Sequence, residues 1–316
     1  MGRPKSRAIA LFEYAAVRGL LGLFRLLPPR AAFAVTDILG DAAWWIDRRH
    51  REVALANVSR ILGGTPGDAA NRRLVRRVFR HFLRVGAEFA LLPDLIARRG
   101  LDRVIEIEGR ENVAAALASG TGVIVFSAHL GNWEAIAAAG APVGMRLHSV
   151  GRTLDNPWLD RYLTRHRGRY ALSVIPKNQG LPRVVRALKR GDCVAMLLDQ
   201  FAGREGLDVP FLGHPASTFR APAEMAARFG FPLLGGFGVR VDDSPKFHLK
   251  FEPPIFPDTN APREAEVRRL TIAISEMMGK HVLAHPDQWN WLHRRWRTAA
   301  KPESAEASAA PAGAAP

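Results

Sequence analysis

The feature that most constrains this chain is a short polar segment, residues 129–134 (His-Leu-Gly-Asn-Trp-Glu), that separates an apolar run from an alanine-rich stretch. Residues 122–126 form the apolar run and predict a buried strand. Residues 135–139 predict a helix that ends at Gly140. The polar segment therefore lies where a strand gives way to a helix. In α/β folds this position opens into the crevice beyond the carboxyl ends of the strands, where ligands bind.

Strand-like and helix-like sequence alternates along much of the chain. Apolar or alternating runs predict strands at residues 103–108, 145–150, 172–175, 194–198, 232–241 and 247–251. Helical spacing of apolar residues predicts helices at 112–117, 157–167, 181–188, 222–229 and 267–278. This alternation predicts an α/β fold with a central mixed, mostly parallel sheet flanked by helices.

The 129–134 segment carries side chains suited to proton transfer. The pKa of imidazole is about 6.5, so His129 can accept a proton from a hydroxyl group at neutral pH. A carboxylate that accepts the other ring N–H fixes the tautomer, and Glu134 is predicted to be that partner. No serine or cysteine in the segment is placed as a nucleophile, so a substrate hydroxyl is expected to attack directly. In the alternative interpretation, the two side chains only cap a helix or join a surface ion pair. The H-E-x-x-H spacing of zinc helices is absent, and no metal is expected.

Residues at the ends of three predicted strands are expected to meet at this crevice. Arg152, after Gly151, is predicted to hold a phosphate group of a substrate through paired hydrogen bonds, or to form an ion pair with Asp199. Asp199 and Gln200 follow the buried run at 194–198. The residues predicted to bind substrate are Gly131, Asn132, Trp133, Gly151, Arg152, Asp199 and Gln200.

The charge balance indicates an anionic partner. The chain has 45 Lys and Arg residues against 30 Asp and Glu residues, a net charge of +15. Nucleic acid, anionic lipid headgroups and an acidic carrier protein all suit such a surface. Residues 72–84 predict an amphipathic helix with an arginine-rich face, either solvated or lying on an anionic membrane. The single cysteine, Cys193, excludes an internal disulfide and fits a cytosol-facing compartment.

The N-terminal segment is predicted to associate with a membrane without crossing it. Residues 8–27 are largely apolar, but Glu13, Arg18 and Arg25 interrupt them and two prolines follow. A spanning helix needs about 20 mostly uncharged residues, so an interfacial anchor helix is expected. The pair Trp44 and Trp45 also suits a membrane interface.

Four blocks of sequence, taken in order, resemble one protein family. They are H-L-G-N-W-E at 129–134, G-R-T-L-D-N-P-W-L-D at 151–160, D-Q…G…V-P-F-L-G…A-S-T within 199–218 and Q-W-N-W-L-H-R-R at 288–295. Together they resemble the bacterial lipid A biosynthesis acyltransferases, the lauroyl/myristoyl transferases of the lysophospholipid acyltransferase superfamily. The likeness spans about residues 49–297. Two departures are Leu212, where the family often has Phe, and Gln200, where some members have His.

The resemblance implies an O-acyltransferase. The donor would be an acyl thioester of acyl carrier protein or coenzyme A, and the acceptor would be a hydroxyl of an anionic glycolipid such as a lipid A precursor. A phosphatidylinositol mannoside or a lysophospholipid is the alternative acceptor, and a basic nucleic-acid-binding protein is the alternative of another class. His129 would be the general base, Glu134 its partner, and backbone amides near Gly131 or a nearby arginine would stabilise the oxyanion. No cofactor is implied.

Three regions are expected: membrane-association helices at 1–48, the α/β acyltransferase domain at 49–298 and a disordered tail at 299–316 rich in Ala, Pro, Ser and Glu. The protein is expected to be a monomer on the cytoplasmic face of the bacterial inner membrane, peripheral or monotopic.

Overall fold

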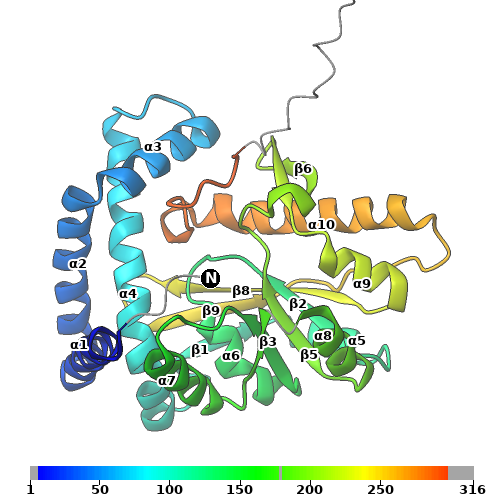
Figure 1. Ribbon diagram of the computed structural model, residues 1–316, viewed down its shortest axis with the longest axis horizontal. Helices are drawn as coiled ribbons and strands as arrows, with labels where there is room; N and C mark the ends of the chain where they lie inside the picture. The colour runs from blue at the N-terminus through cyan, green and yellow to red at the C-terminus, as the bar shows by residue number, and fades with distance from the viewer. Residues whose placement is uncertain (1–5, 178–179, 298–316) are drawn as a thin grey trace, which may run out of the picture.

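The computed structural model describes residues 6–177 and 180–297. Its centre is a seven-stranded sheet with the order β1-β9-β8-β2-β5-β3-β4 (Figure 1). The strands are β1 (Ile105–Glu108), β2 (Val123–Ser127), β3 (Leu147–Gly151), β4 (Ser173–Pro176), β5 (Cys193–Leu197), β8 (Leu233–Val241) and β9 (Lys246–Phe251). Neighbouring strands are parallel except β8 and β9, which are antiparallel. The predicted mixed, mostly parallel sheet is confirmed.

The central strand β2 is buried on both faces of the sheet. Ile124 and Phe126 point into the hydrophobic core that contains α9 (Ala221–Phe229) and α10 (Arg263–Ala284). Val123 and Val125 point into the opposite core, which contains α5 (Arg110–Leu117) and α6 (Glu134–Gly140). Successive side chains of a strand face opposite ways, so an uninterrupted apolar run is what a strand between two helical layers requires.

The remaining elements connect or flank this sandwich. Helix α7 (Pro157–Gly168) follows β3, and α8 (Gly180–Lys189) follows β4. A two-stranded antiparallel hairpin, β6 (Leu207–Phe211) and β7 (His214–Thr218), follows β5 and packs against α10. This hairpin lies outside the predicted strands.

Four N-terminal helices form a layer beside one end of the sheet: α1 (Arg7–Leu26), α2 (Pro29–Ile46), α3 (Arg48–Leu62) and α4 (Ala69–Arg99) (Figure 1). Both α1 and α2 pack along α4, and α1 also contacts α7. The Asn156 side chain, for example, donates a hydrogen bond to the Ala10 carbonyl at 2.7 Å. Within the described residues, no helix is both long and apolar enough to cross a membrane.

The arginine-rich face predicted at 72–84 lies on α4, where part of it is used in ion pairs with α2. Arg76 and Arg80 both bind the Asp41 carboxylate, at 2.5 and 2.6 Å, and Arg84 binds Asp37 at 2.6 Å. These contacts hold the two helices together, so this part of the face is not simply solvated. The predicted boundary after residue 48 falls at the start of α3, and the predicted tail at 299–316 lies outside the described residues.

Candidate active site

Adjacent parallel strands bring the polar loops to one edge of the sheet. In the order β2-β5-β3, Ser127 is in register with Leu197, so His129 and Asp199, each two residues further along, emerge side by side. The end of β3 supplies Gly151 and Arg152 next to them. The carboxyl ends of parallel strands lie at a common edge of the sheet. The three segments therefore converge there, although some 70 residues separate His129 from Asp199.

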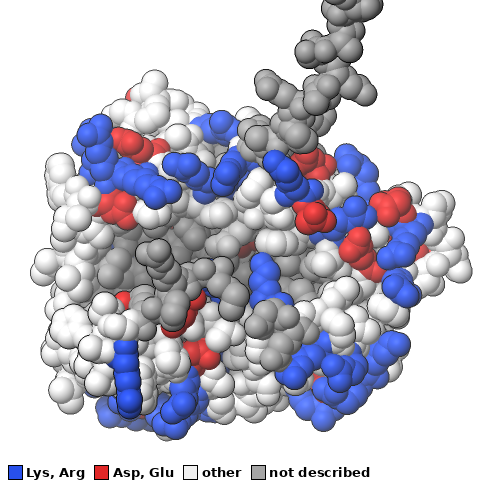
Figure 2. Space-filling model, in the orientation of Figure 1, with Lys and Arg blue, Asp and Glu red and all other residues white. Residues whose placement is uncertain are grey.

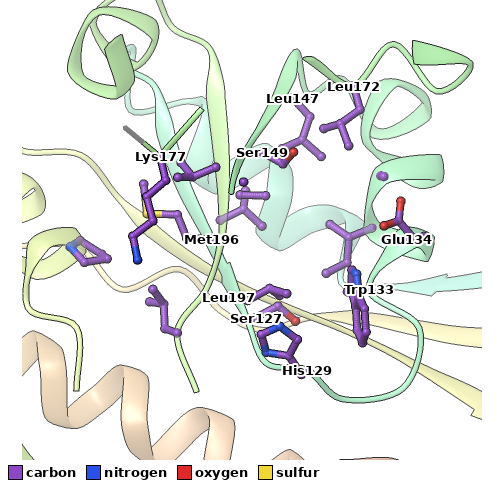
Figure 3. Close-up of a pocket in the computed structure, with 18 of the residues that line it drawn as sticks. Ser127, His129, Trp133, Glu134, Leu147, Ser149, Leu172, Lys177, Met196 and Leu197 are labelled. Atoms are coloured by element: carbon purple, nitrogen blue, oxygen red, sulfur yellow. The ribbon is translucent and has the colours of Figure 1, made fainter. Parts of the chain in front are cut away.

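This edge opens into a cavity of about 530 Å³ (Figure 3). Its walls are largely apolar and include Val125, Ile136, Leu147, Leu172 and Met196. The predicted site residues that line it are His129, Trp133, Glu134, Gly151, Arg152 and Gln200. In Figure 3 the His129 ring lies at one side of the cavity, next to Ser127 and Trp133. The cavity therefore combines an ionisable ring with a wall suited to a hydrocarbon chain.

Asp199 is the carboxylate that binds His129. The ring Nδ1 of His129 lies 2.8 Å from Asp199 Oδ1, and the backbone N–H of His129 donates to Oδ2 at 2.8 Å. The indole N–H of Trp289 donates to the same Oδ2, also at 2.8 Å. Because a carboxylate accepts hydrogen bonds, Nδ1 carries the proton and Nε2 keeps a lone pair for a substrate.

The two groups shift each other's pKa. Burial by itself would lower the pKa of His129, but the charge and hydrogen bond of Asp199 outweigh it and raise that pKa above its ordinary value. Burial would raise the pKa of Asp199, whose side chain is 1% exposed, but His129 and the donated hydrogen bonds lower it. Asp199 is therefore ionised at neutral pH and stabilises an imidazolium as it forms.

The predicted pairing of Glu134 with His129 is wrong. Glu134 is the first residue of α6, and its carboxylate binds Arg167 of α7, with Nη2 to Oε1 at 2.6 Å. The helix begins at Glu134 and directs its side chain toward α7, while Asp199 already occupies Nδ1 from the neighbouring strand. Glu134 and Arg167 are 5% and 17% exposed and both line the cavity. They form a buried ion pair in its wall.

Gly131 and Asn132 shape the loop and do not line the cavity. Gly131 has φ of 57°, and a Cβ there would lie 2.0 Å from the Gly238 carbonyl oxygen. Its N–H donates to the Gln288 carbonyl, and the N–H of Asn132 donates to Gly238. These two amides are therefore occupied within the protein and are not free to bind an oxyanion. The buried Asn132 side chain links the Glu134 N–H to the Glu88 carboxylate at 3.0 Å each.

Arg152 pairs with Asp155 rather than with Asp199. Its guanidinium lies 3.3 Å from the Asp155 carboxylate, and its side chain is 74% exposed at the cavity. The predicted ion pair with Asp199 is therefore not formed. Asn156 caps α7, accepting hydrogen bonds from the N–H groups of Trp158 and Leu159.

Sequence reasoning missed several functional contacts. The indole N–H of Trp289 binds Asp199, a contact that no sequence pattern indicates. No sequence pattern indicates that Arg167 pairs with Glu134 or that Lys177 lines the cavity. A closing block rich in Trp and Arg was the available signal for Trp289, although nothing in it indicates the partner. Among the described residues, no group of three or more His, Cys, Asp or Glu side chains is placed to hold a metal.

A mostly parallel α/β sheet with a histidine–carboxylate pair beside an apolar cavity is the arrangement of an enzyme that can use general-base chemistry on a partly apolar substrate. The chain belongs to the bacterial lipid A biosynthesis acyltransferase family, whose model matches residues 3–298, and the predicted family is thereby confirmed. The protein is an acyltransferase.

The relatives differ in how much of the chain they match. A phosphatidylinositol mannoside acyltransferase of Mycobacterium tuberculosis (strain CDC 1551 / Oshkosh) is 26% identical over 300 residues, 90% of this chain and 88% of its own length. The lipid A biosynthesis palmitoleoyltransferase of Escherichia coli K12 is 26% identical over 212 residues, 65% of this chain and 64% of its own. The lauroyltransferase of the same organism is 27% identical over 204 residues, 63% and 64% of the two chains.

Proposed function

We propose that this protein transfers a fatty acyl chain from an acyl thioester to a hydroxyl group of an anionic glycolipid. The observation that carries the proposal is the His129–Asp199 pair, whose free ring nitrogen is available beside a cavity with apolar walls. The apolar wall would hold the acyl chain. The exposed cations Arg152 and Lys177 at the same cavity would attract the anionic headgroup.

In this mechanism His129 is the general base. Nε2 takes the proton of the acceptor hydroxyl as its oxygen attacks the thioester carbonyl, and the imidazolium is balanced by Asp199. The new C–O bond forms, the C–S bond breaks, and the leaving sulfur takes the proton back from His129. With the amides of Gly131 and Asn132 occupied, the predicted nearby arginine would stabilise the oxyanion, and Arg152 and Arg167 line the cavity. No metal or organic cofactor is required by these steps.

Two acceptors suit the site. We place a lipid A precursor first, because the chain belongs to the lipid A biosynthesis acyltransferase family. A phosphatidylinositol mannoside is the second candidate, because the mycobacterial relative matches 300 residues whereas the Escherichia coli palmitoleoyltransferase matches 212. Both are anionic glycolipids with free hydroxyl groups. We propose that the enzyme meets them as a peripheral or monotopic protein on the cytoplasmic face of the inner membrane.

The test is transfer of radiolabelled acyl chains, from acyl carrier protein and from coenzyme A, to a panel of lipid acceptors. The panel contains a lipid A precursor, a phosphatidylinositol mannoside and a lysophospholipid. His129→Ala is expected to lower turnover about 10²–10⁴-fold, because the general base is lost. The control is His50→Ala, whose exposed ring lies on α3 and pairs with Asp47. A His129→Ala enzyme with the wild-type rate would remove the basis of the proposal.

A further inference from the structure

A buried ion pair joins the N-terminal helices to the central sheet. Glu88 of α4 and Arg240 of β8 are 1% and 4% exposed, and the Nε of Arg240 donates to Oε1 of Glu88. The Nη1 of Arg240 also lies 3.1 Å from the ring Nδ1 of His81 on α4. Burial and the charge of Arg240 hold the pKa of His81 well below its ordinary value, so this ring is neutral. Each charge of the pair depends on the other, because a buried charge without its partner is strongly destabilising.

The second carboxylate oxygen of Glu88 reaches the loop that carries His129. The Nδ2 of Asn132 donates to Glu88 Oε2 at 3.0 Å, and the Oδ1 of Asn132 accepts the N–H of Glu134 at 3.0 Å. An ionised carboxylate only accepts hydrogen bonds, so it fixes which way the Asn132 amide points. The NH2 group faces Glu88, and the oxygen faces the first N–H of α6. Asn132 is fully buried, so this orientation is set by protein groups and not by solvent.

The other member of the pair supports the same loop through its backbone. The N–H of Arg240 donates to the side-chain oxygen of Gln288 at 2.9 Å, and the Gln288 amide donates to the Arg240 carbonyl at 3.0 Å. The carbonyl of Gln288 accepts the N–H of Gly131 at 2.9 Å, and the N–H of Asn290 donates to the His129 carbonyl at 3.1 Å. Two chains of hydrogen bonds therefore lead from the Glu88–Arg240 pair to the 129–134 loop.

We propose that Glu88 is a positioning residue for acyl transfer, which acts through Asn132 and Arg240 to hold the loop that presents His129 to the cavity. Glu88 itself does not line the cavity. The inference rests on the proposed role of His129 as general base, because a displacement of about 1 Å can cost a catalytic group on the order of 10²-fold in rate. It makes α4 a support of the active site as well as the helix against which α1 and α2 pack.

A role in stability alone is the competing interpretation, and the ring of Trp133 offers a way to separate the two. The ring centres of His129 and Trp133 lie 5.3 Å apart at an angle of 70°. The ring current of an indole at this distance makes the NMR signals of the His129 ring sensitive to the shape of the loop. A purely stabilising ion pair would change the melting temperature without moving these signals in the folded protein.

The experiment begins with Glu88→Gln, which retains the size of the side chain and removes its charge. We expect kcat to fall about 10–100-fold at a temperature where circular dichroism shows the protein folded, because the base is displaced. The KM for the acyl donor should stay unchanged, because Glu88 does not contact the cavity. The His129 ring signal, identified as the one that His129→Gln removes, should shift.

A rescue variant tests whether Glu88 and Asn132 act as a pair. Asn132→Asp alone places two carboxylates in contact, so it should impair kcat at least as much as Glu88→Gln. In the double variant Glu88→Gln with Asn132→Asp, the new amide donates to the new carboxylate, which still accepts the Glu134 N–H. A negative charge near Arg240 is also restored. The double variant should recover at least tenfold in kcat over Asn132→Asp and return the His129 signal toward its wild-type position.

Two further variants complete the test. Glu266→Gln removes another buried carboxylate, 3% exposed and paired with Arg269 at 2.6 Å on α10. It should lower the melting temperature without changing kcat or the His129 signal. Asn132→Ala breaks the contact with Glu88 from the loop side and leaves the Glu88–Arg240 pair in place. It should lower kcat and shift the signal in the same way, so the proposal can be tested even if Glu88→Gln does not fold.

The two proposals fail separately. Wild-type kcat and an unshifted His129 signal in Glu88→Gln, or in Asn132→Ala where the glutamine variant does not fold, overturn the inference about Glu88 and leave the acyl transfer proposal standing. A His129 signal that shifts in Glu88→Gln and returns in the double variant, in a protein whose wild type transfers no acyl chain, supports the positioning of the loop and overturns the proposed function.

Discussion

At the scale of single residues, two carboxylates near His129 have different partners. Asp199 follows β5, the strand next to β2, and accepts the ring N–H. Glu134 lies in the same segment as His129 but begins α6 and binds Arg167. Both carboxylates are buried, so leaving either of them unpaired would destabilise the folded protein. Their roles follow from their partners: Asp199 orients the His129 ring, and Glu134 holds α6 against α7 in the cavity wall.

We predict that Asp199→Asn costs far more activity than Glu134→Gln. The asparagine removes the charge that stabilises the imidazolium and permits the wrong tautomer, so kcat/KM should fall about 10²–10⁴-fold. The glutamine leaves the His129–Asp199 contact intact and weakens the hold on Arg167, so the loss should be nearer tenfold, with a lower melting temperature. Transfer kinetics and thermal unfolding measure both. Equal losses in the two variants would mean that Glu134 takes part in proton transfer after all.

At the scale of elements, the 129–134 loop is held by backbone contacts on both sides. It forms a bridge to the 288–295 segment, where Leu130 pairs with Trp289, and its Asn132 N–H donates to Gly238 of β8 at 2.7 Å. The close approach to β8 is possible because residue 131 is a glycine with positive φ. The loop that carries His129 is therefore held in place by backbone contacts with segments more than 100 residues away in sequence.

We predict that Gly131→Ala displaces this loop and nearly abolishes transfer. The new Cβ would lie 2.0 Å from the Gly238 oxygen, and a backbone oxygen cannot move aside as a flexible side chain can. The matched control is Gly86→Ala in α4, where the new Cβ meets no atom within 4 Å and helix propensity should add about 0.5–1 kcal/mol of stability. Activity assays and chemical denaturation report the two effects. A fully active Gly131→Ala enzyme would show that the loop tolerates movement.

At the scale of the whole molecule, apolar side chains are exposed on α1 and α2. The most exposed are Leu26 (84%), Ile46 (82%), Phe12 (74%), Ile38 (69%) and Trp45 (67%). In Figure 2 the left edge of the molecule, where α2 lies, is mostly uncharged, whereas basic side chains gather at the lower right, where α8 lies. The exposed apolar side chains of α1 and α2 suit contact with the apolar layer of a bilayer.

We predict that Phe12→Glu with Leu26→Glu lowers binding to vesicles of anionic phospholipid by about tenfold or more, because both side chains would otherwise enter the apolar layer. The control is Leu181→Glu, a 50% exposed leucine on α8, at the other end of the molecule in Figure 1. Vesicle flotation measures the bound fraction. Unchanged flotation of the double variant would place the membrane contact elsewhere.

The sequence by itself determined the local structure and the position of His129, the proposed base. Apolar runs of strand length alternate with helical patterns, because a strand between two helical layers must be apolar on both faces. His129 was assigned to the end of such a strand for that reason. The four sequence blocks were enough to indicate the family, since each combines several residue types at fixed spacing.

Only the tertiary structure decided which groups meet. Asp199 binds His129 because β5 lies beside β2 in the sheet, and strand order cannot be predicted from local periodicity. The same holds for Trp289, which binds the Asp199 carboxylate, and for Arg295, which binds the carbonyl of Gln200. Glu134, five residues from His129, was the natural choice by sequence distance. The helix that begins there directs its carboxylate to α7, because side-chain direction depends on the fold and not on separation along the chain.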